Sequence, residues 1–260
     1  MTMVLLVDLR NRFLAFSLYS SSRQEVASFK TLSDKLKSAD EYALSLRQFL
    51  ALENVSKEDI EGALLESVVP TLTKRVEKAI SAVIGKPCLV LSKQLKLGLK
   101  IRMDYPDEVG ANLLSASLGA IDDYQEDSLV ICLGSCISFS LVTKEKEFLG
   151  GSLFPGIRES LAEMCETNEK LNEIELTRPG RLIGKSTAES MNSGLVKGYL
   201  LLLDAMSEGI EKEYGKPVLR ILTGPDAGIL KDFVSHSYRY NPHLLFDGLF
   251  DIYQKNKERC

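Results

Sequence analysis

Histidine and cysteine, which commonly serve as catalytic groups and zinc ligands, are few in this sequence. Its two histidines, His236 and His243, belong to no recognisable nucleophile motif, so a catalytic triad has little to build on. The cysteines form an odd set of five without a CxxC pair: Cys88, Cys132, Cys136, Cys165 and Cys260. No histidine stands near them to complete a zinc site, so we expect reduced thiols in the core.

The charge balance argues against several classes of partner. Lys and Arg total 32 and Asp and Glu total 36, giving a net charge of -4, which creates no broad attraction for nucleic acid or anionic lipid. The apolar start of the chain is interrupted at Asp8 and Arg10, far short of the roughly 20 residues that span a membrane. We therefore expect a cytoplasmic protein with a small-molecule ligand or a protein partner, and no nucleic acid or membrane partner.

The elements that could position a site follow a repeated order. Apolar runs at 4–8 and 13–19 predict a strand hairpin, and helical or strand-like spacing continues over the first half. There we expect helices at 33–52, 56–61, 71–84 and 110–122, and strands at 63–69 and 88–91.

The second half begins again with strands before helices. We expect strands at 128–133, 137–143, 148–153 and 218–222, and helices at 157–165, 186–213 and 227–235. Two such successions predict a duplicated α/β architecture with a cleft between the halves. The predicted domains are 1–122 and 123–260, and the last helix can pack back on the first domain.

Several ordered segments resemble motifs of the type III pantothenate kinases. Residues 67–73 (SVVPTLT) resemble SVVPxLT, and 108–111 (EVGA) resemble the start of EVGADR. Residues 148–157 (FLGGSLFPGI) are similar to (Y/F)LGGxIxPGI, and 183–194 (IGKSTAESMNSG) to IGKxTxxxMxSG. Ordinary turns would explain any one segment. They do not explain all of them in this order over nearly the whole chain.

The resemblance implies a fold, an activity and partners. The family fold is that of the acetate and sugar kinase, chaperone and actin superfamily: two duplicated actin-like (ribonuclease H-like) domains with a nucleotide cleft between them. The family activity is ATP-dependent phosphorylation of pantothenate to 4'-phosphopantothenate in coenzyme A biosynthesis. We therefore expect a homodimer, with ATP and Mg²⁺ as cofactors where nucleotide binding is retained.

The first phosphate loop departs from the family pattern. The family has DxGNT, and this chain has Asp8-Leu9-Arg10-Asn11-Arg12. The resemblance implies that Asp8 and Asn11 bind nucleotide and that Asp8 serves magnesium. Arg10 stands where a glycine gives close backbone approach, so it should block or bend the loop. Both arginines are either solvated charges at a turn or part of a retained anion site.

The second motif and a later turn are also altered. The family's DFGTATT is matched by residues 132–138 (CLGSCIS), in which Gly134 and Ser135 keep a small turn implied to bind nucleotide. Cys132 replaces the acid associated with a monovalent cation, so we expect that cation site to be absent. We expect Cys132 and Cys136 to be core thiols. The family's TGG turn becomes TGP, which retains Gly224 at a nucleotide position and loses a backbone donor.

The positions implied for catalysis and substrate binding are changed most. The family's GADR holds the proposed general base and an arginine that binds the pantothenate carboxylate. Here Gly110 remains, Asn112 stands at the base position and cannot take a proton near neutral pH, and Leu113 replaces the arginine. Thr187 matches a family threonine near the substrate. Met103 aligns with a family tyrosine of that site.

Three functional hypotheses remain open on the sequence alone. The first is a pseudoenzyme with a binding or regulatory role, pairing with itself or with an active paralogue. The second is an active kinase of pantothenate or another small hydroxyl substrate, with Asp8, Asp107 or Glu108 as relocated base. The third is an accessory regulator of transcription, although no basic or helix-turn-helix feature supports direct DNA contact.

Overall fold

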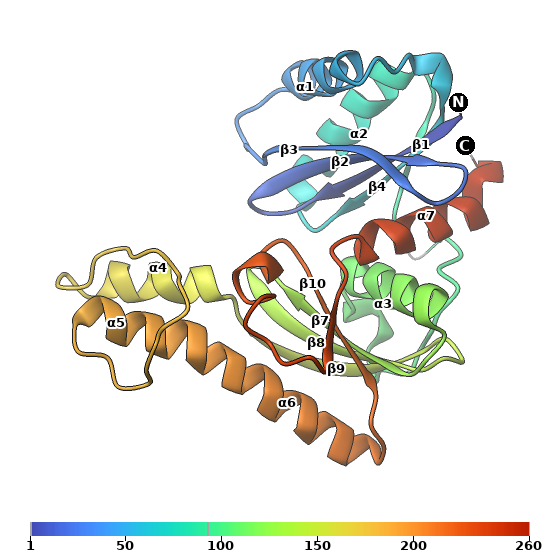
Figure 1. The fold of residues 1–260 in the computed structure, drawn as a ribbon. Coiled ribbons are helices and arrows are strands. Elements are labelled where there is room, and N and C mark those ends of the chain that lie inside the picture. Colours follow the sequence, from blue (N-terminus) through green and yellow to red (C-terminus); the bar gives the residue numbers. More distant parts are fainter. Residues whose placement is uncertain (1, 93, 260) are drawn as a thin grey trace. The chain divides into compact units, whose positions relative to one another are not determined.

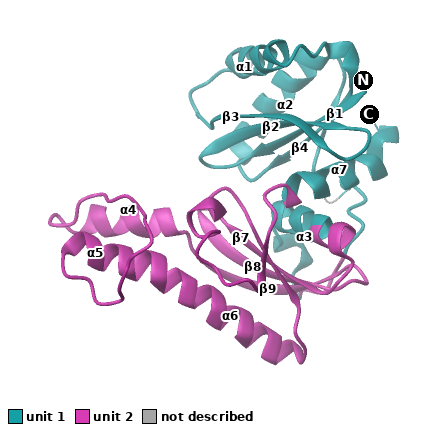
Figure 2. Cartoon of the chain, in the orientation of Figure 1, with its two compact units in different colours: residues 1–99, 104–119, 245–260 teal, residues 100–103, 120–244 magenta. Residues whose placement is uncertain are grey.

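The structure is a computed structural model that describes residues 2–92 and 94–259, and its chain forms two compact units (Figures 1 and 2). Unit 1 comprises Met1–Leu99, Asp104–Gly119 and Leu245–Cys260, and unit 2 comprises Lys100–Met103 and Ala120–Leu244. Cys260, one of the five cysteines, lies outside the described residues. Within those residues no helix has the length and apolar character needed to cross a membrane.

Each unit is built on one mixed sheet. The strands are β1 (Met3–Leu9), β2 (Phe13–Ser20), β3 (Glu25–Leu32), β4 (Ile60–Ser67), β5 (Cys88–Val90), β6 (Lys100–Ile101), β7 (Ser128–Leu133), β8 (Cys136–Val142), β9 (Glu147–Pro155), β10 (Leu219–Thr223) and β11 (Tyr238–Tyr240). The helices are α1 (Ala39–Leu52), α2 (Pro70–Ile84), α3 (Ala111–Tyr124), α4 (Ile157–Thr167), α5 (Thr187–Asn192), α6 (Gly198–Tyr214) and α7 (Leu244–Asn256).

The two sheets have the same topology, which confirms the predicted duplication. The first has the order β3-β2-β1-β4-β5, and the second contains β9-β8-β7-β10-β11 in the equivalent order, extended by β6. In both, an antiparallel meander is joined to two parallel strands, through β1 with β4 and through β7 with β10. The mixed α/β architecture is therefore an actin-like pair of related units.

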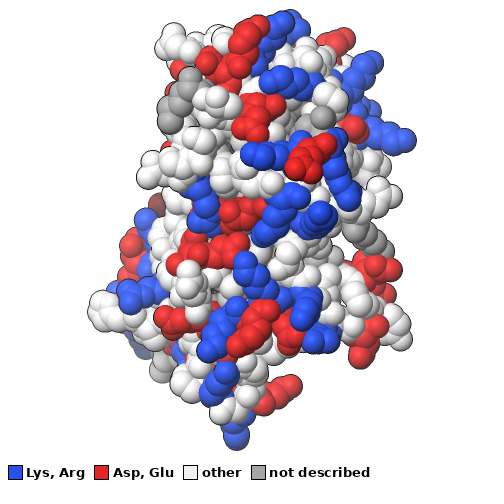
Figure 3. Space-filling model, turned by 90° about the vertical axis from the view of Figure 1, so that its right-hand side faces the viewer, with Lys and Arg blue, Asp and Glu red and all other residues white. Residues whose placement is uncertain are grey.

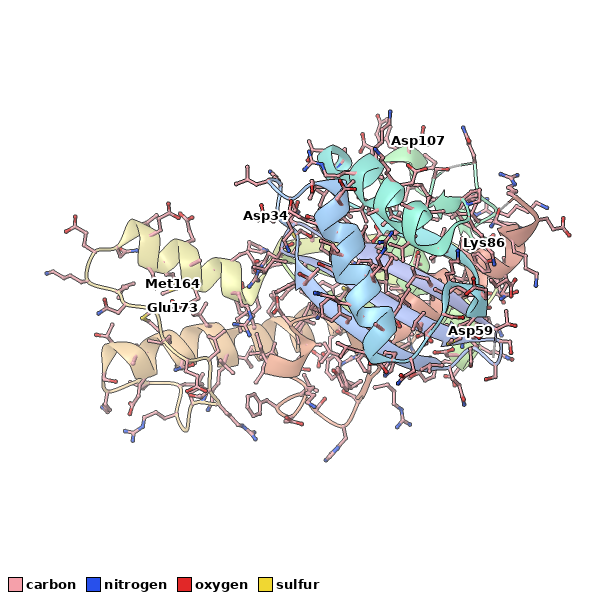
Figure 4. All side chains as sticks on the ribbon, turned by 90° about the horizontal axis from the view of Figure 1, so that it is seen from above. Asp34, Asp59, Lys86, Asp107, Met164 and Glu173 are labelled. Atoms are coloured by element: carbon pink, nitrogen blue, oxygen red, sulfur yellow. The ribbon has the colours of Figure 1, made fainter. Side chains whose placement is uncertain are left out.

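Alternation along β1 separates two apolar layers of unit 1. Leu5 and Val7 belong to a cluster with α1 and α2, whereas Val4 and Leu6 belong to a cluster with residues of α3 and α7. Successive strand side chains point to opposite faces, so a run buried throughout indicates a sheet covered on both sides. Figures 1 and 4 show α1 and α2 together over one face of this sheet.

The SVVPTLT segment has a structural role at the junction of β4 and α2. Pro70 is the first residue of α2, where its missing N–H costs no hydrogen bond. Ser67 Oγ accepts from the Val69 N–H at 3.1 Å and lies 2.8 Å from Thr73 Oγ1, which donates to the Val69 carbonyl at 3.1 Å. These hydroxyls connect strand end and helix start, so the motif fixes a turn.

Three of the predicted helices differ from the structure in length or type. The helix predicted at 33–52 begins only at Ala39, because Ser38 forms a capping box with Glu41. The helix predicted at 56–61 is one 3₁₀ turn, Lys57–Asp59, in which Ser56 hydrogen-bonds Asp59 before β4 starts. The helix predicted at 227–235 is likewise a single 3₁₀ turn, Ala227–Ile229.

Other differences from the sequence prediction concern interruptions and short edges. The helix predicted at 186–213 is divided into α5 and α6 by a π-helical turn, Ser193–Lys197. Strands β3, β6 and β11 were not predicted: β3 has a mixed polar sequence, and the other two have only two or three residues. Such short strands carry too little alternation to be recognised.

The largest apolar cluster of unit 2 lies on one face of its sheet. Leu129, Ile131 and Leu133 of β7 pack with residues of α4, α5, the π-helical turn and α6. Figures 1 and 4 show α4 running beside α5 and the start of α6, and Met164 and Glu173 mark α4 and the segment that follows it. This helical layer supports the strands whose ends carry the predicted nucleotide loops.

Three loops at the carboxyl ends of unit 2 strands pack directly on one another. Gly224, at φ +101°, leaves no room for a side chain, because a Cβ would stand 2.3 Å from the Leu133 carbonyl oxygen. A Cβ on Gly156 would stand 2.2 Å from the Gly134 carbonyl oxygen. Asp226 N–H donates to the same Leu133 carbonyl at 3.0 Å, and Gly156 N–H to the Ser135 carbonyl at 3.0 Å. These glycines are needed for packing between loops.

Strand β10 is also tied to α6 by a partly buried ion pair. Arg220 donates from Nε to Glu211 Oε1 at 3.1 Å and from Nη2 to Oε2 at 2.6 Å, and the Val218 N–H donates to Oε1 at 3.3 Å. The hydrogen bonds from Arg220 lower the pKa of the Glu211 carboxyl below its usual range, against the opposing effect of burial. The charged form of Glu211 is therefore part of the folded structure.

We predict that Gly224→Ala destabilises the protein strongly whereas Gly228→Ala does not. A non-glycine residue at this positive φ costs about 1–3 kcal/mol, and the contact with Leu133 adds to it. Gly228 has nothing within 4 Å of its Cβ position, so its substitution should change the free energy of unfolding by less than about 0.5 kcal/mol. Urea unfolding of both variants measures the difference; equal effects would contradict the packing role.

We predict that Glu211→Gln lowers stability at neutral pH and that the loss shrinks in acid. A depressed carboxyl pKa contributes stability above the unfolded pKa of about 4.5, and that contribution disappears as pH falls through the folded pKa. Hydrogen bonds to charged groups contribute about 1.5–3 kcal/mol, which sets the loss expected near pH 7. Urea midpoints at neutral and acid pH test this, with exposed Glu208→Gln on α6 as control; a loss independent of pH would exclude the ion pair as its source.

Candidate phosphate-loop sites

The predicted first phosphate loop begins at Asp8, the penultimate residue of β1. The Arg10 N–H donates to the Phe13 carbonyl at 2.8 Å and closes a tight turn. Arg10 Nε donates to both carboxylate oxygens of Asp8, at 2.7 and 3.0 Å. Arg10 is not among the residues with positive φ, so the turn does not require a glycine here. The long side chain folds back onto the acid, and the solvated-charge interpretation of Arg10 is wrong.

The tip of the same loop is exposed. Asn11 and Arg12 are both accessible to solvent. The Arg12 guanidinium carbon lies 5.4 Å from the centroid of the Phe13 ring, and Lys30 Nζ lies 5.3 Å from it. A cation beside an aromatic ring is held by the ring's negative face. Arg12 is thus directed to Phe13, while Arg10 is directed to Asp8.

Glu66 is a second acid of this site that the sequence analysis missed. Parallel pairing of β1 with β4 sets Glu66 opposite Asp8, and Glu66 is fully buried. Burial, followed by the charge of Asp8, raises the pKa of Glu66 well above its usual range, and Arg10 acts in the opposite direction. No donor reaches either Glu66 oxygen, so the protonated carboxyl is the form that can interact favourably, by donating to Asp8. The sequence feature that could have revealed this residue is a single glutamate within an otherwise apolar predicted strand.

The predicted catalytic position lies at the start of α3. Asn112 Oδ1 stands 2.7 Å from the place a Cβ would occupy on Gly110, so the amide side chain lies over its own turn. The Gly110 carbonyl accepts from the Leu113 N–H at 3.0 Å. Just before this turn, exposed Asp107 lies on the surface in the 3₁₀ turn Pro106–Glu108 (Figure 4). Asn112 is placed by helix initiation, and its amide offers no proton acceptor of a base's strength.

Met103 stands at the position of a family tyrosine, and Tyr105, two residues further on, is the nearest tyrosine that could substitute for it after a local shift; the two have different surroundings. Met103, at the position of the family tyrosine, belongs to unit 2, and its Sδ occupies the space beside Gly150, where a Cβ would stand 2.8 Å away. Tyr105 belongs to unit 1 and is 70% exposed. Met103 therefore packs on a glycine with φ +119° in β9.

In unit 2 the structure brings Gly134, Ser135 and Gly224 together at the carboxyl ends of β7 and β10. Ser135 is exposed and Gly134 is buried. The Pro225 ring covers Gly134, with its Cγ 3.5 Å from the Cβ position of that glycine. Arg158 Nε donates to Asp226 Oδ1 at 2.9 Å from the first turn of α4. The turn after β10 thus contacts both the turn after β7 and the first turn of α4.

The duplication identifies the pair in unit 2 that corresponds to Asp8 and Glu66. In the matching register, Cys132 of β7 lies opposite Thr223 of β10. Cys132 is partly buried and Thr223 is buried, and neither is a carboxylate. The expectation of a core thiol was wrong for Cys136, which is exposed at the start of β8 because it follows directly on the turn.

Thr187 is the first residue of α5 and is exposed. The helix is capped by Ser186, whose Oγ accepts from the Glu189 N–H at 3.2 Å. Gly184 allows the preceding chain to pass close to α5, because a Cβ there would stand 2.4 Å from the Ser190 nitrogen. The IGKSTAESMNSG segment therefore builds a helix start and leaves the Thr187 side chain accessible.

The surface carries no large field of one sign on the face shown in Figure 3, where acidic and basic side chains alternate. This agrees with the near-balanced composition. An anionic ligand would therefore depend on local donors at the loop ends.

Comparison with known proteins places these features in a family. The model of the type III pantothenate kinase family matches residues 4–209. The type III pantothenate kinase of Moorella thermoacetica is 31% identical over 254 residues, covering 98% of this chain and 100% of its own. That of Persephonella marina is 30% identical over 252 residues, covering 96% and 98%.

Solved structures agree on the fold. A Baf family transcriptional activator from Campylobacter jejuni superposes with a TM-score of 0.61 at 19% identity, covering 98% of this chain and 99% of its own. A ROK family glucokinase from Streptomyces griseus, with glucose and AMPPNP, gives 0.51 at 10% identity, covering 96% and 97%. With the family model and relatives of about 30% identity along the whole chain, this protein belongs to the type III pantothenate kinase family.

Proposed function

We propose that this protein is a catalytically impaired member of the family, a pseudoenzyme that acts by binding. The observation that carries the proposal is Asn112 at the family base position, with its amide folded over Gly110. An amide cannot accept the proton of an attacking hydroxyl near neutral pH, and a general base commonly contributes about 10²–10⁴ in rate. Kinase families in general use ATP and a divalent metal, so nucleotide is the first ligand to test.

The substrate side of the site supports the same conclusion. Leu113 stands where the family arginine binds a carboxylate, and an apolar side chain forms no charge-assisted hydrogen bond. Thr187 remains accessible as a hydroxyl for a small ligand. Losses in residues that act together are not additive, so restoring one of them should recover little.

A binding role needs a partner, and we propose a second copy of this chain or an active paralogue. Several large apolar side chains of unit 2 are exposed to solvent: Leu153, Phe154, Leu182, Ile183 and Leu201. Burying such side chains against another protein is favourable by about 25 cal/mol per Å². The family's expected homodimer offers one way to bury them.

We predict that pantothenate-dependent ADP release by the wild type is at least about 10² below that of the Moorella thermoacetica relative assayed in parallel. The reaction contains ATP, magnesium, potassium and pantothenate, and its background lacks pantothenate. Asn112→Asp combined with Leu113→Arg should raise the rate above that of Asn112→Ala combined with Leu113→Arg, because only an aspartate can accept a proton. Calorimetric titration of ATP measures binding separately.

Turnover within tenfold of the relative would contradict the proposal and favour an active kinase with a relocated base. Asp107→Asn and Glu108→Gln would then identify the base by loss of that rate. Nucleotide binding without turnover supports a binding subunit. Loss of both nucleotide binding and turnover would confine the proposed role to its protein partners.

A further inference from the structure

Asp8 and Glu66 form an unusual pair of acids in unit 1. They occupy opposite positions on neighbouring parallel strands, which lie about 4.8 Å apart, so their side chains leave the same face of the sheet. Asp8 is 9% exposed and Glu66 is fully buried. Two carboxylates this close in a dry environment repel each other, and at least one countercharge or proton is needed to keep them there.

A divalent cation is one solution to such a pair, but these residues do not fit one. Mg²⁺ requires an octahedron of oxygen ligands with lone pairs available. Both Asp8 oxygens already accept from Arg10 Nε, and a metal ion there would stand beside a guanidinium of the same sign. Among residues 2–92 and 94–259 there is also no group of three or more His, Cys, Asp or Glu side chains that could hold a metal.

We propose that the Arg10 guanidinium takes the place of a divalent cation at the Asp8–Glu66 pair. Its Nε lies at hydrogen-bonding distance from both oxygens of Asp8, and 77% of its side chain surface is withdrawn from solvent, since 23% is exposed. The countercharge is thus built into the chain at the position where the family has a glycine. The negative charge at the start of loop 8–12 is therefore balanced by Arg10 and needs no metal ion.

The neighbouring Arg12 offers a control for the charge and backbone effects of an Arg10 substitution. Arg12 lies two residues further on, is exposed, and faces the ring of Phe13. It therefore serves as a matched control, because Arg12→Gly removes the same charge and adds the same backbone freedom in the same turn.

The inference deepens the proposed function, since losing a metal position is one route to losing phosphoryl transfer. It rests on the assignment of residues 8–12 to the family's phosphate loop. Its test measures metal binding and thermal stability, whereas the proposed function is tested by ADP release. Each can therefore fail while the other holds.

The test is a metal rescue of Arg10→Gly. We expect its Tm to fall by several degrees more than that of Arg12→Gly, because the carboxyl pair loses its cation, and about 2–4 °C corresponds to each kcal/mol in a chain of this size. Millimolar MnCl₂ should restore at least half of that fall. It should shift the Tm of the wild type and of Arg12→Gly by less than about 1 °C at matched ionic strength.

A second part of the test substitutes Asp8, the acid that pairs with Arg10. Asp8→Asn combined with Arg10→Gly removes both charges, so it should be more stable than Arg10→Gly alone and should lose the MnCl₂ rescue. Electron paramagnetic resonance of free Mn²⁺ reports binding directly: Arg10→Gly should deplete the signal, and the wild type should not.

Three outcomes would overturn the inference. Wild-type protein that depletes the Mn²⁺ signal in an Asp8-dependent manner would show that the pair binds metal despite Arg10. A folded Arg10→Gly that neither loses stability relative to Arg12→Gly nor binds Mn²⁺ would show that Arg10 compensates nothing. Should Arg10→Gly fail to fold, Arg10→Lys keeps a cation, and Mn²⁺ bound by that variant through Asp8 would equally exclude the proposal.

Discussion

The parallel pairing of β1 with β4 sets the main electrostatic constraint on unit 1. It places two carboxyl groups side by side where the sheet is covered on both faces, and buried carboxylates are stable only when paired, hydrogen-bonded or protonated. Arg10 pairs with Asp8, and burial raises the pKa of Glu66 well above its usual range. The conformation of loop 8–12 follows from this, because Arg10 must turn back over the strand end to reach its partner.

In unit 2 the equivalent strand pairing places two uncharged side chains opposite each other. Cys132 and Thr223 occupy the equivalent register, and the turn above them is filled by contacts of the chain with itself. Pro225 covers Gly134, and Gly224 lies against Leu133. Both units have the same topology, whereas the side chains at the strand ends differ. A duplicated fold fixes where a site can form and leaves its chemistry free to differ.

The sequence predicts the duplication and most strands, because alternation and apolar runs are local properties. The resemblance to the family's phosphate loop implies Asp8 as a site residue, and its role in ligand binding stays a prediction. Glu66 escaped prediction because its significance depends on register with a strand more than fifty residues earlier. The ion pair between Arg10 and Asp8 was not predicted for a related reason. The sequence shows a charged residue at a turn, and only the structure shows the direction of the Arg10 side chain. The roles predicted for Asn11 and Thr187 in ligand binding stay predictions.

The residues shared with the family motifs are largely those that the fold itself needs. Ser67 and Thr73 connect β4 to α2, Gly184 lets a loop pass α5, and Gly156 and Gly224 permit close loop packing. A substitution at any of these positions would cost stability whether or not the protein turns over substrate, so they are expected to persist after catalysis is lost. Similarity carried by such positions is therefore evidence of common fold and descent. In the proposed function, the loss of activity follows instead from positions 112 and 113, where this chain has asparagine and leucine.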